Sequence, residues 1–278
     1  MKKLFIGLFI IGFIIAFNAN VFAEAEGKRV IEEQIILKDP TVAESKKWVI
    51  GGSFEYWYVS GKWTEYDSAG NTTADGTIDG SMPGYNVYVG YDKFTLLYVY
   101  RPGDFDIDKK MTGTNVQTKL NQDQKEHEIV ARYLFTTDKL FNFYVLAGYS
   151  NIKLKETDDI VTSGWVWTYN LNTRYSATTD FNSVLAGIGA IVPLTKSKNL
   201  GIRGDVRGMF TDAEWKRDDG LTVSGNGVGA GGTLTGYWNI YKGINLQVGG
   251  RYQYLNGGDA GWKWLSGAFA SLGYTYRF

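Results

Sequence analysis

Cysteine is absent from the 278-residue chain, which excludes disulfide bonds, thiolate metal ligands and a lipid-modified N-terminal cysteine. Beyond the N-terminal region there is also no run of 18 apolar residues, so the chain could cross a membrane only as a closed barrel of strands. Proline is scarce, at 4 residues, and histidine occurs once. Acidic and basic residues balance at 29 each, so no charge excess indicates a nucleic-acid partner.

Glycine and aromatic residues are abundant. The chain has 35 glycines, and 15% of its residues are aromatic, including 19 tyrosines. Such a composition favours strands flanked by aromatic girdles over helices.

The N-terminus has the three parts of a secretory signal peptide. Met1-Lys2-Lys3 precedes an apolar stretch over 4–17, and Val21-Phe22-Ala23 gives a small-residue exit. Fourteen apolar residues are too few to span roughly 30 Å of hydrocarbon, which argues against a membrane anchor. We therefore predict cleavage after Ala23, which removes two lysines and leaves a formal charge of about −2.

Residues 24–46 are polar and mixed in charge, apart from Ile35-Ile36-Leu37. The main prediction for them is a periplasmic lead before the barrel domain, which would occupy 47–278. The alternative is a short element that folds into the barrel mouth.

The rest of the chain alternates with period 2, as strands with one apolar face do. Ten segments show this pattern: 48–58, 85–91, 94–100, 129–135, 141–149, 184–192, 200–210, 228–238, 244–254 and 268–278. We predict an all-β fold, an antiparallel up-and-down transmembrane β-barrel of ten strands. Eight or twelve strands are the alternatives, because Val30–Leu37 could add a strand and the segment 152–179 could hide a hairpin.

The opposite face of these segments carries charges, which are too many for a dry core but suit a wet or salt-bridged lumen. The apolar face therefore points to lipid. Six arginines and three acids are predicted to face inward: Arg101, Arg132, Arg203, Arg207, Arg251 and Arg277, with Glu55, Glu128 and Asp205. Because buried charges are stable only when paired, we expect these side chains to form a cross-strand network. The excess of arginine would make any narrow pore prefer anions. Glycines such as Gly187, Gly189 and Gly231 indicate room on one wall.

Long and short connections alternate along the chain. The long ones are predicted at 61–81, 102–123, 152–179, 212–224 and 255–261, and the tight ones at 92–93, 136–140, 193–198 and 241–243. Long extracellular loops and short periplasmic turns are usual in bacterial barrels, and an even strand number predicts that both termini are periplasmic.

The last residues resemble the assembly signal of bacterial outer-membrane β-barrel proteins. Ser271 and Gly273 take its polar and glycine places, and Tyr276 and Phe278 take the third-from-last and last aromatic places. The resemblance implies an outer-membrane location, contact with outer-membrane lipid and lipopolysaccharide, and assembly by the barrel-assembly machinery with periplasmic chaperones. We expect a monomer.

Two enzyme families share this architecture and give alternative functions. The omptin proteases pair two acids on one extracellular loop with an acid and a histidine on an opposing loop. Asp104, Asp106 and Asp108 could supply the first pair, and Asp212 or Glu214 the second acid, but the single histidine, His127, lies elsewhere. Lipid A deacylases and the outer-membrane phospholipase use a serine and a histidine facing the outer leaflet, yet Ile129, the next residue on the face of His127, is not a nucleophile.

Asp104, Asp106 and Asp108 would lie about 7 Å apart on one strand face, where they could contact a divalent cation or lipopolysaccharide. The tryptophans of Gly164–Tyr169 and of Gly261–Trp264 indicate either an adhesive surface or strand extensions that rest on lipid headgroups. We predict no catalytic residues, no metal site and no cofactor. The predicted function is a structural or surface role, or slow passage of small anions, with a loop-borne adhesin or a surface enzyme as the alternatives.

Overall fold

The computed structural model describes residues 48–66, 72–111, 117–135, 141–159, 176–241 and 243–278. The predicted signal peptide (1–23), the predicted lead (24–46) and Val30–Leu37 lie outside these ranges. The described residues form ten strands and one short 3-10 helix: β1 (Trp48–Tyr66), β2 (Thr72–Tyr91), β3 (Phe94–Met111), β4 (Gln117–Leu134), β5 (Asn142–Asp159), β6 (Ser176–Pro193), β7 (Leu200–Arg217), β8 (Thr222–Tyr241), β9 (Ile244–Asn256), η2 (Gly258–Ala260) and β10 (Trp262–Arg277).

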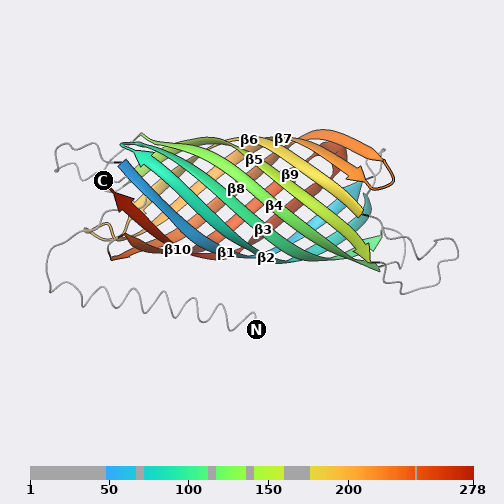
Figure 1. Cartoon of the computed structure of the whole chain (residues 1–278), viewed down its shortest axis with the longest axis horizontal. Helices are drawn as coiled ribbons and strands as arrows, with labels where there is room; N and C mark the ends of the chain where they lie inside the picture. The colour runs from blue at the N-terminus through green and yellow to red at the C-terminus, as the bar shows by residue number, and fades with distance from the viewer. Residues whose placement is uncertain (1–47, 67–71, 112–116, 136–140, 160–175, 242) are drawn as a thin grey trace. The chain divides into compact units, whose positions relative to one another are not determined.

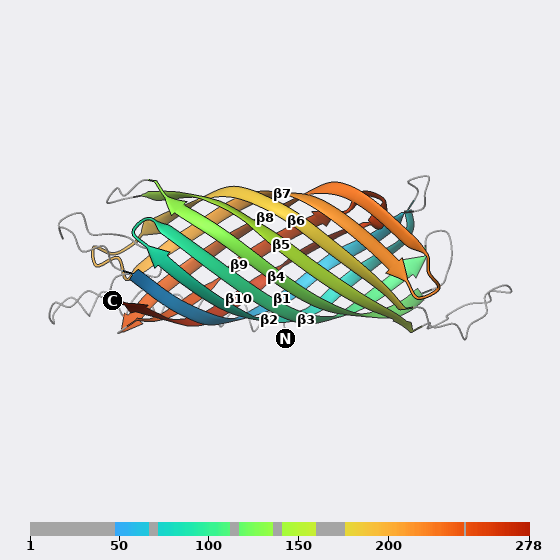
Figure 2. The ribbon, with the colours of Figure 1, turned by 45° about the horizontal axis from the view of Figure 1, so that its top comes forward.

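The strands form one closed antiparallel barrel (Figures 1 and 2). Each strand pairs with its neighbours in sequence, and β1 pairs with β10 to close the ring. The prediction of a ten-stranded up-and-down barrel is therefore confirmed. Within the described residues no helix is long and apolar enough to cross a membrane.

The end of the barrel at which β1 begins and β10 finishes is called the turn end, and the opposite end is the loop end. Asp92 begins the two-residue connection between β2 and β3 with a φ of 53°, a left-handed conformation that aspartate tolerates better than most residues. Gly243, with a φ of 91°, precedes β9 in the same way. The last strand, β10, also finishes at the turn end, where Phe278 and Trp48 exchange two backbone hydrogen bonds of 3.1 Å.

An apolar band covers the outside of the barrel. Its members alternate with buried inward residues along every strand, and include Phe54, Val87, Ile188, Val206 and Leu272, all of them exposed. Aromatic residues border the band at both ends, among them Phe94, Phe141 and Phe278 toward the turn end and Tyr58, Tyr85 and Tyr149 toward the loop end. An exposed apolar belt between two aromatic girdles is the surface that a lipid bilayer requires.

The strands are longer than the sequence predicted. The segments 61–81, 102–123 and 212–224, expected as long loops, lie mostly in strands, namely β1 to β4, β7 and β8, so those predictions were wrong. The 19 residues of β1 rise about 48 Å at roughly 3.3 Å per residue and a tilt of about 40°, against an apolar band of about 25 Å. The barrel therefore continues well beyond the band at the loop end.

In this extension the alternation continues but the chemistry of the two faces is exchanged. On β3, Tyr98 faces outward within the band, whereas farther along the same strand Asp104 and Asp106 face outward and Phe105 and Ile107 face inward. The exchange has a simple cause: beyond the bilayer the outer face meets water, and the inner face becomes the core.

Two apolar clusters lie inside the barrel: the first extends from the turn end, at Leu134 and Ile191, into the loop-end half, and the second lies in the loop-end half. The first joins strands that are not neighbours and contains Val130, Leu134, Tyr144, Leu146, Ile152, Leu154, Phe181, Leu185, Ile191, Met209, Ala213 and Leu255. The second, which we call the plug, contains Trp57, Val59, Trp63, Ile78, Met82, Phe105, Ile107, Leu120, Leu265 and Phe269. Side chains therefore fill the loop-end half of the lumen.

Inward glycines are covered by tyrosines and do not widen the lumen. A Cβ atom at Gly189 would overlap the ring of Tyr144 on β5, and one at Gly201 would overlap Tyr237 on β8. The guanidinium of Arg207 similarly approaches Gly231. The room that Gly187, Gly189 and Gly231 indicated is thus occupied by neighbouring atoms, which at Gly187 belong mainly to the backbone of Val206 and Arg207, so that prediction was wrong.

Candidate functional site

The nine predicted lumen charges all occupy inward positions. Glu55, Arg101, Glu128, Asp205 and Arg251 are buried, and Arg132, Arg203, Arg207 and Arg277 are partly buried. Arg277 lies at the end of β10, between the exposed Tyr276 and Phe278. The sequence thus located the charged residues, and the structure shows which of them meet.

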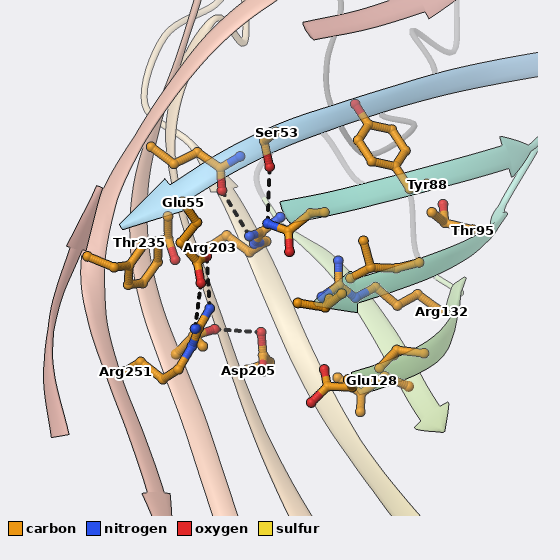
Figure 3. A pocket seen from close by; sticks show the side chains of 18 of the residues that line it. Ser53, Glu55, Tyr88, Thr95, Glu128, Arg132, Arg203, Asp205, Thr235 and Arg251 are labelled. Atoms are coloured by element: carbon orange, nitrogen blue, oxygen red, sulfur yellow. Dashed lines mark hydrogen bonds and ion pairs between the residues drawn. The ribbon is translucent and has the colours of Figure 1, made fainter. Parts of the chain in front are cut away.

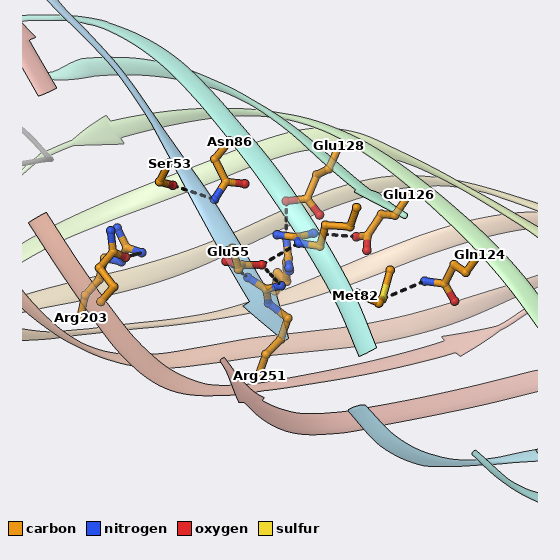
Figure 4. A network of polar contacts seen from close by, with 12 residues as sticks. Ser53, Glu55, Met82, Asn86, Gln124, Glu126, Glu128, Arg203 and Arg251 are labelled. Carbon is orange, nitrogen blue, oxygen red and sulfur yellow. Dashed lines mark hydrogen bonds and ion pairs between the residues drawn. The ribbon is translucent and has the colours of Figure 1, made fainter. Parts of the chain in front are cut away.

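A chain of ion pairs crosses the middle of the lumen (Figure 4). Arg251 donates from Nη1 to Glu55 Oε1 at 2.6 Å and from Nη2 to Oε2 at 3.0 Å. Arg101 donates from Nε to Glu55 Oε1 at 2.9 Å and from Nη1 to Glu126 Oε1 at 3.0 Å. The four side chains come from β9, β1, β3 and β4, so the chain ties together strands that do not all pair.

A second set of bonds links β4, β5, β7 and β8. Arg207 Nη1 donates to Glu128 Oε1 at 2.8 Å, across the gap between β7 and β4. Asp205 Oδ2 accepts hydrogen bonds from Thr233 Oγ1 at 2.7 Å and from Tyr144 at 3.2 Å. Buried carboxylates are stable only when paired or hydrogen-bonded, and each of these two meets that condition.

Two of the predicted arginines join no ion pair within the described part of the chain. Arg203 donates from Nη2 to the amide oxygen of Gln247 at 3.1 Å. The guanidinium carbon of Arg132 lies 5.9 Å from the centre of the Tyr144 ring. The groups that these two arginines contact directly, an amide and an aromatic ring, are therefore uncharged.

A cavity of about 70 Å³ lies in the turn-end half of the lumen (Figure 3). Glu55, Glu128, Arg132, Arg203, Asp205 and Arg251 are among the residues around it, and Figure 3 shows them pointing into one space from different strands. At about 10 to 15 Å³ per water by the same measure, this volume holds several water molecules or one small ligand.

Lys263 is a functional candidate that the sequence analysis missed. It is 1% exposed and reaches from β10 to β4, donating to Gln122 Oε1 and, at 2.8 Å, to Gln124 Oε1. Gln122 in turn donates to Glu156 Oε1 at 2.6 Å, and the ammonium group of Lys263 lies 4.5 Å from the centre of the Phe105 ring. The signal for it was present, because Trp262 and Trp264 continue the outward alternation of β10 on either side of Lys263.

Asp104, Asp106 and Asp108 share the outer face of β3, beyond the apolar band. Asp104 is in register with Asp123 of β4, and a hydrogen bond between the two carboxyl groups, with partial burial and charge repulsion, raises the pKa of Asp104. Among the described residues no group of three or more acidic or histidine side chains is arranged as a metal site. The predicted contact with cations or lipopolysaccharide stays a prediction.

The residues considered for enzyme chemistry lie on the outer wall. His127 is exposed between two tyrosines of β3, with its Nδ1 2.9 Å from the Tyr98 hydroxyl and its ring centre 4.9 Å from that of Tyr100. Asp212 faces outward on β7, and Glu214 occupies the next outward position. These side chains do not face one another across the barrel mouth.

The residues of the predicted assembly signal divide between the two faces of β10. Ser271 and Gly273 are buried inside, and Tyr276 and Phe278 are exposed outside with ring centres 6.0 Å apart. Trp262 and Trp264 belong to β10 itself. The tryptophans of 164–169 lie outside the described residues.

Comparison with known proteins gives the fold. No protein-family model and no curated protein sequence matches the chain. Among solved structures, the outer-membrane protease OmpT of Escherichia coli aligns with a TM-score of 0.59 at 10% identity, covering 83% of this chain and 97% of that one.

Two further structures align with lower TM-scores. They are the translocator domain of the autotransporter NalP of Neisseria meningitidis (TM-score 0.46, 11% identity, 84% and 89% coverage) and OprG of Pseudomonas aeruginosa (TM-score 0.38, 13% identity, 84% and 96% coverage). At these identities the likeness concerns the fold alone. The alignment with OmpT agrees with the closed barrel fold, and the exposed apolar band is the surface that a membrane-spanning barrel requires.

Proposed function

We propose that this protein is a non-enzymatic, monomeric outer-membrane barrel with a structural or surface-exposed role, whose lumen is closed to ions at rest. The observation that carries the proposal is the packing of the plug. Trp57 and Met82 are 0% exposed and Phe105 is 1% exposed, all inside the loop-end half of the barrel. Barrels of about eight strands are filled by their own side chains, and ten strands lie near that limit.

Polar contacts strengthen the closure. The bonds of Lys263 to Gln122 and Gln124 connect β10 with β4, and the ion pairs of Glu55 lie beneath them. An ion would have to displace both layers, and breaking buried charge pairs is costly. Slow passage of anions, the other role that the sequence predicted, therefore requires movement of the plug.

The surface role rests on the strand extension. Beyond the apolar band, β2 to β7 present outward polar side chains such as Asp79, Lys153 and Asp212 on a hydrogen-bonded wall. Connections that begin and end on such a wall are positioned more precisely than connections held only by other loops. Such a wall is suited to holding a binding surface outside the membrane, as a loop-borne adhesin would need.

The non-enzymatic part of the proposal is supported by where the candidate residues lie. An omptin-like protease needs acids and a histidine facing each other, whereas His127 and Asp212 are on the outer wall. Incubation of the folded barrel with peptides and with lipopolysaccharide should give no turnover. Turnover that disappears in His127→Ala would overturn this part of the proposal.

Single-channel conductance tests the closed lumen. The mature chain, residues 24–278, is refolded and inserted in a planar bilayer under a salt gradient. We expect no steady conductance from folded protein. Steady steps that prefer anions would instead identify a narrow arginine-lined pore, with Arg203 and Arg207 as the next residues to neutralise.

A further inference from the structure

The facing positions of β4 and β7 change from unlike to like charge toward the turn end. Arg207 and Glu128 meet across the lumen at 2.8 Å. One inward position nearer the turn end on each strand, the side chains are Val130 and Asp205, and one inward position further they are Arg132 and Arg203. The second inward level from the ion pair therefore presents an arginine from both strands.

Neither of these two arginines forms an ion pair within the described residues, although the nearby carboxylate of Asp205 attracts both. Arg203 bonds to the neutral Gln247, and Arg132 lies over the ring of Tyr144. Asp205, the carboxylate at the adjacent level, accepts from Thr233 and Tyr144 and forms no ion pair within the described residues. In both arginines the Nε atom is buried without a hydrogen-bond acceptor among the described residues.

The cavity that the two arginines line has an excess of positive charge. Five arginines and three carboxylates surround it: Arg101, Arg132, Arg203, Arg207 and Arg251, with Glu55, Glu128 and Asp205. Glu55 is used by Arg101 and Arg251, and Glu128 by Arg207. Glu126 also lies inside the lumen and is bonded to Arg101, so with it five arginines face four carboxylates, and the one positive charge in excess belongs to the level of Arg132 and Arg203.

We infer that Arg132 and Arg203 form a binding site for a small oxyanion in the turn-end cavity. A planar guanidinium matches the oxygen pairs of phosphate and carboxylate groups, so two of them on facing walls favour an oxyanion over a spherical ion. The cavity of about 70 Å³ has room for such a group. The inference does not depend on the role proposed above, because it concerns the half of the lumen beneath the ion pairs.

The test measures phosphate binding to the refolded mature chain in zwitterionic detergent. Titration calorimetry with sodium phosphate and with sodium chloride at equal ionic strength should show phosphate binding at least about tenfold more tightly. Arg203→Gln and Arg132→Gln should each weaken phosphate binding about ten- to a hundredfold, because each removes hydrogen bonds to a charged ligand. The matched control is Arg217→Gln, which removes an arginine beside the exposed Asp219 and should leave the affinity unchanged.

A second variant separates binding from folding. Arg203→Lys keeps the charge but removes the planar fork, so it should fold and still bind phosphate more weakly. Each variant is checked for an intact barrel by circular dichroism and by heat-dependent mobility on a gel. Equal affinity of folded Arg203→Gln and of the wild type, equal affinity for chloride and phosphate, or the same loss in Arg217→Gln would overturn the inference.

Discussion

Arg251 of β9 and Glu55 of β1 form a two-bond ion pair inside the lumen, although β10 lies between their strands. The guanidinium of Arg251 also lies 5.1 Å from the ring centre of Trp57 and 5.0 Å from that of Phe269. One side chain thus joins the charged middle of the barrel to the apolar plug above it.

Removal of the Glu55 carboxylate should destabilise the barrel strongly. Glu55→Ala leaves Arg251 buried without its carboxylate, whereas Arg101 retains Glu126. We expect the free energy of unfolding to fall by about 3 to 5 kcal/mol, the usual effect of breaking a buried ion pair. Urea titration of the barrel reconstituted in lipid vesicles measures the change.

The control for Glu55→Ala is an exposed ion pair. Lys153 and Asp180 lie 3.8 Å apart on the outer wall, so Lys153→Gln should change the free energy of unfolding by less than about 1 kcal/mol. A similar loss in the free energy of unfolding of both variants would show that the ion pair in the lumen stabilises the barrel no more than an exposed one.

Replacement of plug residues should open the lumen. Phe105→Ala and Trp57→Ala each remove a large ring from the packed cluster, at a cost of about 3 to 5 kcal/mol in the free energy of unfolding. In planar bilayers the folded variants should show conductance steps that the wild type lacks. Ser60→Ala, on the outer face of β1, should remain silent.

A folded double variant, Trp57→Ala with Phe105→Ala, that is still silent would contradict the assignment of the plug as the barrier. The barrier would then lie in the ion pairs of Glu55, the next layer toward the turn end.

Within the apolar band, the side of the barrel wall on which each side chain lies could be predicted from the sequence. Period-2 alternation placed Glu55, Arg101 and Asp205 inside and Phe54 and Val206 outside, and the structure has them there. The reason is geometric, because successive side chains of a strand point to opposite faces whatever the neighbouring strands do.

The length of the strands could not be read in the same way. A search for an apolar outer face ends at Tyr100, because Asp104 and Asp106 beyond it are charged. The strand nevertheless continues, and its apolar residues Phe105 and Ile107 change to the inner face. When the apolar residues of one continuous strand change from outward to inward positions, the pattern indicates that the barrel wall extends beyond the membrane.

Which inward side chains contact one another inside the lumen also could not be predicted from the sequence. Glu55 and Arg251 are 196 residues apart, and Lys263 and Gln124 are 139 residues apart. Which inward side chains meet depends on the tilt and register of the closed ring, which local alternation does not determine. Lys263 was missed for a different reason, because Gly261–Trp264 was interpreted through its tryptophans, as an adhesive surface or a strand extension.

Alanine at a covered glycine should destabilise the barrel. The Cβ atom of Gly189→Ala would overlap the ring of Tyr144, so we expect a loss of about 1 to 3 kcal/mol in the free energy of unfolding. Gly208→Ala is the control, because its Cβ atom would meet no atom within 4 Å and the change should be small. Both are measured by urea titration in lipid vesicles.

A double-mutant cycle attributes this loss to the overlap. The double variant Gly189→Ala with Tyr144→Ala should lose less stability than the sum of the two single variants. Without the Tyr144 ring, the new Cβ atom at position 189 has nothing to overlap, so its steric cost disappears. Strict additivity would contradict the contact between the tyrosine and the glycine as the cause.

Replacement of the last residue should separate assembly from stability. The Phe278 side chain is 64% exposed, and the backbone bonds that Phe278 shares with Trp48 survive in Phe278→Ala. The purified variant should therefore refold with a free energy of unfolding within about 1 kcal/mol of the wild type. In cells, by contrast, the resemblance of the C-terminus to an assembly signal predicts that less of the variant reaches the outer membrane.

Leu272→Ala is the matched control for Phe278→Ala, because Leu272 lies on the same outward face of β10 and is 57% exposed. Outer-membrane fractions of cells that express each variant are compared by immunoblotting. Normal accumulation of Phe278→Ala would contradict the signal, whereas an equal loss in both variants would assign the defect to lipid contact. Only a loss confined to Phe278→Ala, with refolding intact, supports recognition of the terminal aromatic residue during assembly.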